Sequence, residues 1–161
     1  MSIQQLSLFR SDEGETPRRK QILMILQNVD PLSPAARFVP DRCVRDGWNP
    51  FDIDLSTVTG GKEQEVSVRV VILQDNLTFM TGEGDITAGC ELSQKYLRRL
   101  SPPTCEPARD LEFLIAPLSP GGPELQFNLG LVASGVLTGA DGELVRWKLP
   151  IVLDPKIRNL N

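Results

Sequence analysis

The residues that could carry out chemistry in this chain are scattered carboxylates and three cysteines, because the sequence contains no histidine. This absence excludes Ser-His-Asp and Cys-His catalysis and the common zinc enzymes, which use imidazole as a base or ligand. Asp52 and Asp54 would share one face of a strand and could bind Mg²⁺, but the spacing implies no third ligand. Turn or surface roles are expected for the other acidic candidates: Asp75, Asp85, Glu91 and Asp110. The sequence therefore favours a non-enzymatic protein with no catalytic residue, metal or cofactor.

The three cysteines, Cys43, Cys90 and Cys105, form neither a disulfide nor a zinc pattern. They are odd in number and widely spaced, and no Cys-x-x-Cys pair is present. We expect buried apolar thiols in a protein of the reducing cytoplasm.

Length and composition fit one globular domain, expected over residues 17–161. Hydrophobic residues make up 40% of the 161 positions, and the formal net charge is −4, which opposes DNA binding by bulk electrostatics. The longest early apolar run, residues 22–26, lacks a signal-peptide frame and falls far short of the ~20 residues of a membrane helix. We therefore expect a cytoplasmic protein with no membrane partner.

Alternation of apolar and polar residues predicts a mainly β protein. Residues 18–29 fit either a helix or a buried strand, and we favour a strand because three cations would oppose the dipole of a helix starting there. Clearer period-two patterns or short apolar runs, separated by turn residues, predict strands over residues 66–73, 77–81, 86–90 and 111–116.

Two segments interrupt this β pattern. Residues 30–62 are punctuated by Pro and Gly, so we expect irregular chain with at most one short helix, after Ser33-Pro34. Residues 92–100 carry Leu92, Tyr96 and Leu100 at helical spacing and predict a two-turn helix, with Arg98 and Arg99 near its carboxyl end.

The last forty residues predict a long hairpin. Leu125, Phe127, Leu129 and Leu131 alternate with polar residues or Gly, and Asp141-Gly142 supplies the turn. On the return strand one apolar face is formed by Val145, Trp147, Leu149, Ile151 and Leu153, while Arg146 and Lys148 lie on the other. The predicted fold is an antiparallel sandwich or small barrel with one or two short helices.

The N-terminal segment contains a short apolar motif, Gln5-Leu6-Ser7-Leu8-Phe9, followed by polar and charged residues up to Thr16. The motif resembles the linear peptide by which bacterial replication and repair proteins bind the DNA sliding clamp, and all five positions match that pattern. The resemblance implies that Gln5 hydrogen-bonds at the rim of the clamp site, Leu6 fills a shallow subsite, and Leu8 with Phe9 enters a deep apolar pocket.

The residues themselves agree with such a use. Large apolar side chains in a charged flank lose ~1.5–3 kcal/mol each by staying exposed, and a partner's pocket would recover it. We expect residues 1–16 to be a flexible tail; the alternative is an edge strand packed on the domain. The nearby cations Arg18, Arg19 and Lys20 are candidates for contact with DNA held by the clamp, although we favour a solvated charged entry to the first element.

The leading hypothesis is therefore a non-enzymatic accessory factor recruited to the clamp in DNA replication, repair, or phage or mobile-element DNA metabolism, with DNA reached through the clamp. Two alternatives stay open. One is an assembly or structural β-protein, for example of a phage particle, which oligomerises and does not bind the clamp. The other is a small-ligand-binding β-barrel, which requires a deep cavity with convergent polar groups.

Overall fold

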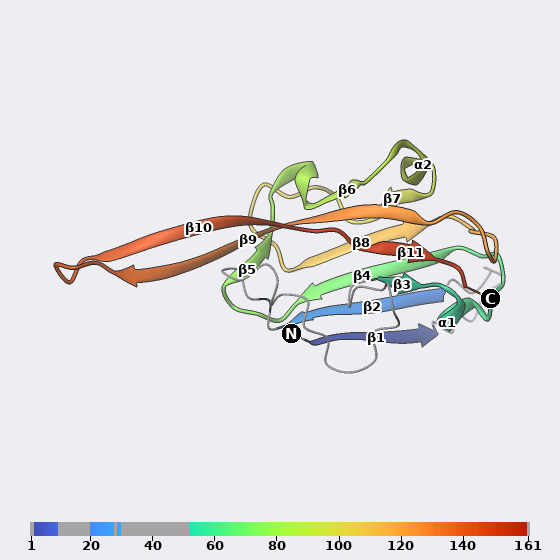
Figure 1. Cartoon of the computed structure of the whole chain (residues 1–161), viewed down its shortest axis with the longest axis horizontal. Coiled ribbons are helices and arrows are strands. Elements are labelled where there is room, and N and C mark those ends of the chain that lie inside the picture. Colours follow the sequence, from blue (N-terminus) through green and yellow to red (C-terminus); the bar gives the residue numbers. More distant parts are fainter. Residues whose placement is uncertain (1, 10–19, 28, 30–51, 161) are drawn as a thin grey trace.

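The computed structural model describes residues 2–9, 20–27, 29 and 52–160 (Figure 1). Most of these residues belong to eleven strands, and the helices are single turns, so the predicted mainly β fold is confirmed. The strands are β1 (Ser2–Phe9), β2 (Lys20–Gln27), β3 (Ile53–Asp54), β4 (Val66–Ile72), β5 (Leu77–Phe79), β6 (Ile86–Ala88), β7 (Leu97–Arg99), β8 (Asp110–Ile115), β9 (Leu125–Thr138), β10 (Leu144–Leu153) and β11 (Lys156–Arg158). The helical turns are α1 (Ser56–Thr59), η2 (Gly82–Asp85) and α2 (Glu91–Gln94).

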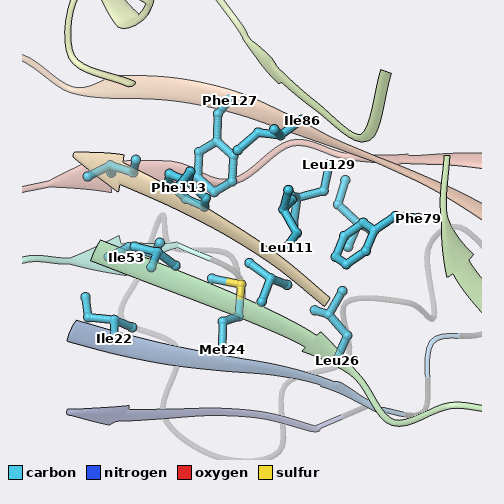
Figure 2. Close-up of a cluster of buried hydrophobic side chains, with 14 of the residues drawn as sticks. Ile22, Met24, Leu26, Ile53, Phe79, Ile86, Leu111, Phe113, Phe127 and Leu129 are labelled. Atoms are coloured by element: carbon cyan, nitrogen blue, oxygen red, sulfur yellow. The ribbon is translucent and has the colours of Figure 1, made fainter. Parts of the chain in front are cut away.

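The strands form two sheets. The first has the order β1-β2-β4-β8-β7, and the second has the order β10-β9-β11-β3, with β5 and β6 also pairing with β9. The core lies between the sheets, where the aromatic rings of Phe113 on β8 and Phe127 on β9 have centroids 5.2 Å apart (Figure 2). Period-two burial along β2, β4 and β9 places one apolar face of each strand in this core.

The two sheets are mixed rather than purely antiparallel. Strand β2 runs parallel to β4, and β11 runs parallel to β3. A parallel pair needs a long connection between its strands, and β2 ends at Gln27 whereas β4 begins only at Val66. The described strands do not close into a barrel, so the architecture is an open two-sheet sandwich. The closed β-barrel that the ligand-binding alternative assumes is therefore not the architecture of the described strands.

The chain changes sheet after Ile72, which alternation alone did not predict. Residues 74–76 turn the chain as expected, but β5 pairs with β9 in the second sheet rather than with β4. The side chain of Gln74 fixes this corner, since its Nε2 donates to the carbonyl of Val29 at 2.8 Å and its Oε1 accepts from the Val29 N–H at 2.6 Å.

The predicted helix over residues 92–100 is wrong beyond its first turn. The helix α2 ends at Gln94, and Leu97–Arg99 form β7, which pairs with β8. Tertiary contacts override the helical spacing here: Arg99 is bound by Asp85, and Tyr96 and Leu97 pack against the core. The placement of Arg98 and Arg99 at a helix end is corrected accordingly, whereas the strand favoured over residues 18–29 is confirmed as β2.

The N-terminal segment also differs from the flexible tail expected over residues 1–16. Ser2–Phe9 form β1, which pairs antiparallel with β2 along its whole length, from Ser2 opposite Gln27 to Phe9 opposite Lys20. Pairing satisfies backbone groups that β2 would otherwise present at an open sheet edge. Residues 10–16 of the expected tail lie outside the described residues.

Candidate protein-interaction surface

The hairpin of β9 and β10 extends beyond the body of the protein (Figure 1). The last residue of β9 that pairs with β5 is Ala133, and among the described strands only β9 and β10 continue past this point. We call residues 134–148 the arm. A two-stranded ribbon that lacks a third strand or a helix to pack on is marginally stable in water.

Local sequence explains how the arm forms. The ladder runs without a bulge from Leu153 opposite Leu129 to Leu144 opposite Thr138. At the tip, the N–H of Gly139 donates to the carbonyl of Glu143 at 2.6 Å, and Gly142 adopts φ 77°, a conformation that favours glycine. The predicted hairpin and its Asp-Gly turn are thus present.

The arm is unusually apolar for an exposed element. Among residues 20–27, 29 and 52–160, seven large hydrophobic residues are exposed, and four of them lie here: Val136 (55% exposed), Leu137 (60%), Leu144 (74%) and Val145 (49%). A cluster of exposed large apolar side chains on a projecting element is typical of a protein-interaction site. The alternation along the same strands predicts instead that their apolar face is covered.

One face of the arm continues the apolar face of the core. Residues directly opposite each other in an antiparallel pair lie on the same face, so Val145 with Leu137 extends the series from Ile151 with Leu131. Burial falls steadily along this series, from buried Ile151 to half-buried Trp147 and exposed Val145. The opposite face carries Val136 and Leu144 together with the cations of β10.

Trp147 marks the point where the arm leaves the body. Its indole covers the backbone of Gly135, its cross-strand partner, and also packs against the core cluster. The ring excludes any side chain at position 135, since an added Cβ would lie 2.6 Å from Nε1 of Trp147. Arg146 and Lys148 lie on the other face, as predicted, so they do not form a stacking platform with the indole.

The outer edge of β10 carries free backbone groups. Within the described residues β10 pairs only with β9. The N–H of Ser134 donates away from β10, to Asn76 at 2.9 Å, which makes Ser134 and Lys148 a non-hydrogen-bonded pair. The even-numbered residues of β10 therefore point their N–H and C=O groups outward, away from β9. Pro150 is one of these residues, so its missing N–H does not remove a hydrogen bond to β9.

The sequence contains a signal for this exposure that simple alternation does not capture. Val136-Leu137 and Leu144-Val145 are consecutive apolar pairs on either side of the turn. Consecutive apolar residues in a strand point to opposite faces, so they cannot all be covered by one core.

The clamp-like motif Gln5–Phe9 lies in β1. The register places Gln5 opposite Met24, Leu6 opposite Leu23 and Leu8 opposite Gln21. The motif is extended, as the clamp-bound peptide is expected to be, but it occupies a paired strand. Of the nearby cations, Lys20 begins β2, whereas Arg18 and Arg19 lie outside the described residues.

The acidic candidates do not converge. Asp52 is buried and accepts from the N–H of Lys156 at 2.9 Å, while Asp54 accepts from the N–H groups of Ser56 and Leu160. Asp110 pairs with Arg69, Asp75 with Arg109 and Asp85 with Arg99, while Glu91 is exposed. Among the residues that the structure describes, no three His, Cys, Asp or Glu side chains form a group that could hold a metal ion.

The cysteines differ from the expectation of buried thiols. Cys90 and Cys105 are exposed, and Cys43 lies outside the described residues. The Sγ of Cys90 lies 3.1 Å from the Oγ of Ser93, and this hydrogen bond is the main cause that lowers the pKa of the thiol. Exposure arises because Cys90 directly precedes α2, on a connection outside the two sheets.

No helix in the described part of the chain is long and apolar enough to cross a membrane. Comparison of the chain with known protein families, curated proteins and solved structures finds no match.

Proposed function

We propose that this chain is a non-enzymatic assembly protein whose copies associate through the arm. The observation that supports the proposal is a two-stranded ribbon that extends from the body and exposes large apolar side chains on both faces. Each such side chain would gain about 1.5–3 kcal/mol on full burial. Contact with another copy recovers part of this free energy and supplies the packing that an isolated hairpin lacks.

Self-association suits the arm because every copy carries the same surface. In a closed symmetric assembly each arm contacts a neighbouring copy and is itself part of the surface that a neighbouring copy contacts. The same residues therefore form both sides of the interface. Asp52, Asp54 and Asp85 are each engaged in a separate structural contact.

Removing the arm tests this proposal. Ala133 and Leu149 form a hydrogen-bonded cross-strand pair, the kind that a two-residue hairpin turn closes, so residues 134–148 can be replaced by Asn-Gly. We expect the parent chain to self-associate with rising concentration in sedimentation velocity and the shortened chain to stay monomeric. A Leu144→Thr, Val145→Thr variant repeats the test at full length with strand-forming residues. Monomeric behaviour of the parent, or equal association of parent and shortened chain, would contradict the proposal.

A second candidate function is recruitment to the bacterial DNA sliding clamp through Gln5–Phe9. All five positions match the clamp-binding pattern, and they lie in a strand at the edge of the first sheet. In this case the protein is an accessory factor in DNA replication, repair, or phage or mobile-element DNA metabolism. It either delivers its domain to the clamp or competes with other clamp ligands.

Clamp binding requires β1 to leave β2, because the clamp peptide binds as an extended chain in a pocket. If β1 is released in only a fraction of the molecules, the apparent affinity for the clamp equals the intrinsic affinity multiplied by that fraction. The free peptide of residues 1–16 should therefore bind a purified clamp more tightly than the full chain does.

Titration of the clamp with parent and Leu8→Ala, Phe9→Ala chains tests this candidate. We expect micromolar binding of the parent, about −8 kcal/mol, and near-complete loss in the double variant. No binding by peptide or chain, or equal binding by parent and variant, would exclude the motif as the anchor.

A further inference from the structure

We infer that the partner of the arm is a second copy of this chain, bound edge to edge through β10 about a two-fold axis at Leu149. The inference rests on the proposed assembly function and specifies its geometry. The two β10 strands would run antiparallel and join the second sheets of two copies into one continuous sheet.

The first basis is the open edge of β10. Its ten residues form the longest unpaired strand edge in the second sheet as described, and Leu144, Arg146, Lys148 and Val152 direct their N–H groups toward it. Such an edge is a template for pairing with another strand. Antiparallel pairing of two identical edges satisfies most groups of both at once; Pro150 lies in the same edge and supplies no N–H, so each copy leaves one carbonyl of the other without a donor.

The second basis is register. Directly opposite residues in a sheet point to the same face. The two copies therefore place their apolar faces on the same side of the joined sheet only if the two-fold axis passes through a residue of β10 and not between two residues. The longest ladders that β10 can form with itself have nine residues, and they centre on Lys148 or on Leu149. Centring on Lys148 would set this cation against its own copy, which is destabilising.

Centring on Leu149 places no two cations directly opposite each other and covers exposed apolar surface, and the two Lys148 side chains become diagonal neighbours. Arg146 then lies opposite Val152 of the second copy, and its aliphatic stem can cover a side chain that is 58% exposed. Trp147 lies opposite Ile151 of the second copy, and Val145 opposite Leu153, so the apolar face of each arm extends the core face of the other copy.

The size of the contact sets its strength. A nine-residue ladder is about 30 Å long, and with a strand thickness of about 10 Å the edge buries roughly 300 Å² per copy. A standard stable interface buries about 800 Å² per partner. We therefore expect a weak, reversible and concentration-dependent dimer.

Cysteine cross-linking tests the register. In a chain with Cys43, Cys90 and Cys105 replaced by serine, Leu149→Cys places two thiols across the axis in a non-hydrogen-bonded pair, about 4.5 Å apart at Cα, which suits a disulfide. We expect a covalent dimer on mild oxidation. The matched control is Val145→Cys, also on the apolar face of β10, whose two copies would lie about 27 Å apart. Cross-linking through position 145 but not 149, or through neither, would overturn the register.

Charge substitution at Val152 gives an independent measurement that does not depend on thiols. Val152→Lys places a cation opposite Arg146 of the second copy, twice per dimer, so the dissociation constant should rise about tenfold. Val152→Glu should lower it by a similar factor. The same pair of substitutions at exposed Leu73, in the connection after β4, is the control and should change nothing.

The two proposals fail in different ways. If the parent associates through the arm but Leu149→Cys does not cross-link and the two Val152 variants behave alike, the edge pairing is wrong and the assembly function stands. If the parent is monomeric at all concentrations, both are wrong.

Discussion

Trp147 and Gly135 are cross-strand partners, and the indole of one covers the bare backbone of the other. The pair lies where the ribbon of β9 and β10 leaves the core, and it is the last point at which the hairpin contacts the core cluster. Residues farther along the hairpin, up to the turn, are mostly exposed. The orientation of the arm relative to the body therefore depends on this aromatic–glycine contact.

Gly135→Ala should disturb the base of the arm, because the added methyl group would overlap the indole. Overpacking of this kind costs about 1–3 kcal/mol. We expect a lower melting temperature and a changed near-ultraviolet circular dichroism signal. The control is Gly139→Ala near the tip, where an added Cβ meets Glu143 at an ordinary 3.5 Å. Equal effects of the two substitutions would mean that the indole does not constrain position 135.

Arg99→Met should destabilise the protein strongly, because it leaves Asp85 buried without its cation. The Nη2 of Arg99 donates to Oδ2 of Asp85 at 2.9 Å, and a second hydrogen bond joins Nη1 to Oδ1. Removing one partner of a largely buried pair costs about 3–5 kcal/mol, measured as the free energy of unfolding in urea. Exposed Arg98→Met on the same strand should cost little, and adding Asp85→Asn to Arg99→Met should recover part of the loss.

Glu124→Gln should weaken the protein at neutral pH but not in acid. Burial alone would raise the pKa of Glu124, but hydrogen bonds and charge from Arg158 and Lys156 outweigh it and lower the pKa below its usual value. A carboxylate with a depressed folded-state pKa stabilises the fold above its unfolded pKa, and that contribution disappears as the pH falls through the folded value.

The difference in free energy of unfolding between parent and Glu124→Gln should be about 1 kcal/mol at pH 7, because the groups are partly exposed. It should shrink below about pH 4. Exposed Glu143→Gln is the control. A difference that stays constant with pH would assign the effect to packing rather than to charge.

Ser93→Ala should slow alkylation of Cys90 near neutral pH. The hydrogen bond from Ser93 is the main cause that lowers the pKa of this thiol, and the thiolate is the reactive form. In a chain with Cys43 and Cys105 replaced by serine, the pH profile of the alkylation rate should move to higher pH. Because Ser93 also accepts from the N–H of Gln126, the fold of the variant is checked by circular dichroism. An unchanged profile would rule out this hydrogen bond as the cause.

Much of the fold followed from local sequence. Short-range sterics specify an extended strand or a hairpin in three segments: the β-branched alternation over residues 66–73, the apolar run after Lys20 and the Asp141-Gly142 turn. The corresponding elements, β4, β2 and the β9–β10 hairpin, are where they were predicted. The open choice between helix and strand over residues 18–29 was decided by pairing of β2 with β4, a contact between segments far apart in the chain.

Only tertiary structure decided which surfaces are covered. The helical spacing of Leu92, Tyr96 and Leu100 was overridden because Arg99 is bound by Asp85, and the N-terminal motif became a strand because β2 offers it a backbone partner. The same holds for the arm: alternation gives every strand an apolar face, but the body ends at Ala133, so Leu137 and Val145 have no second sheet above them. Period-two spacing fixes the direction of each side chain locally, whereas burial depends on what the rest of the chain places opposite it.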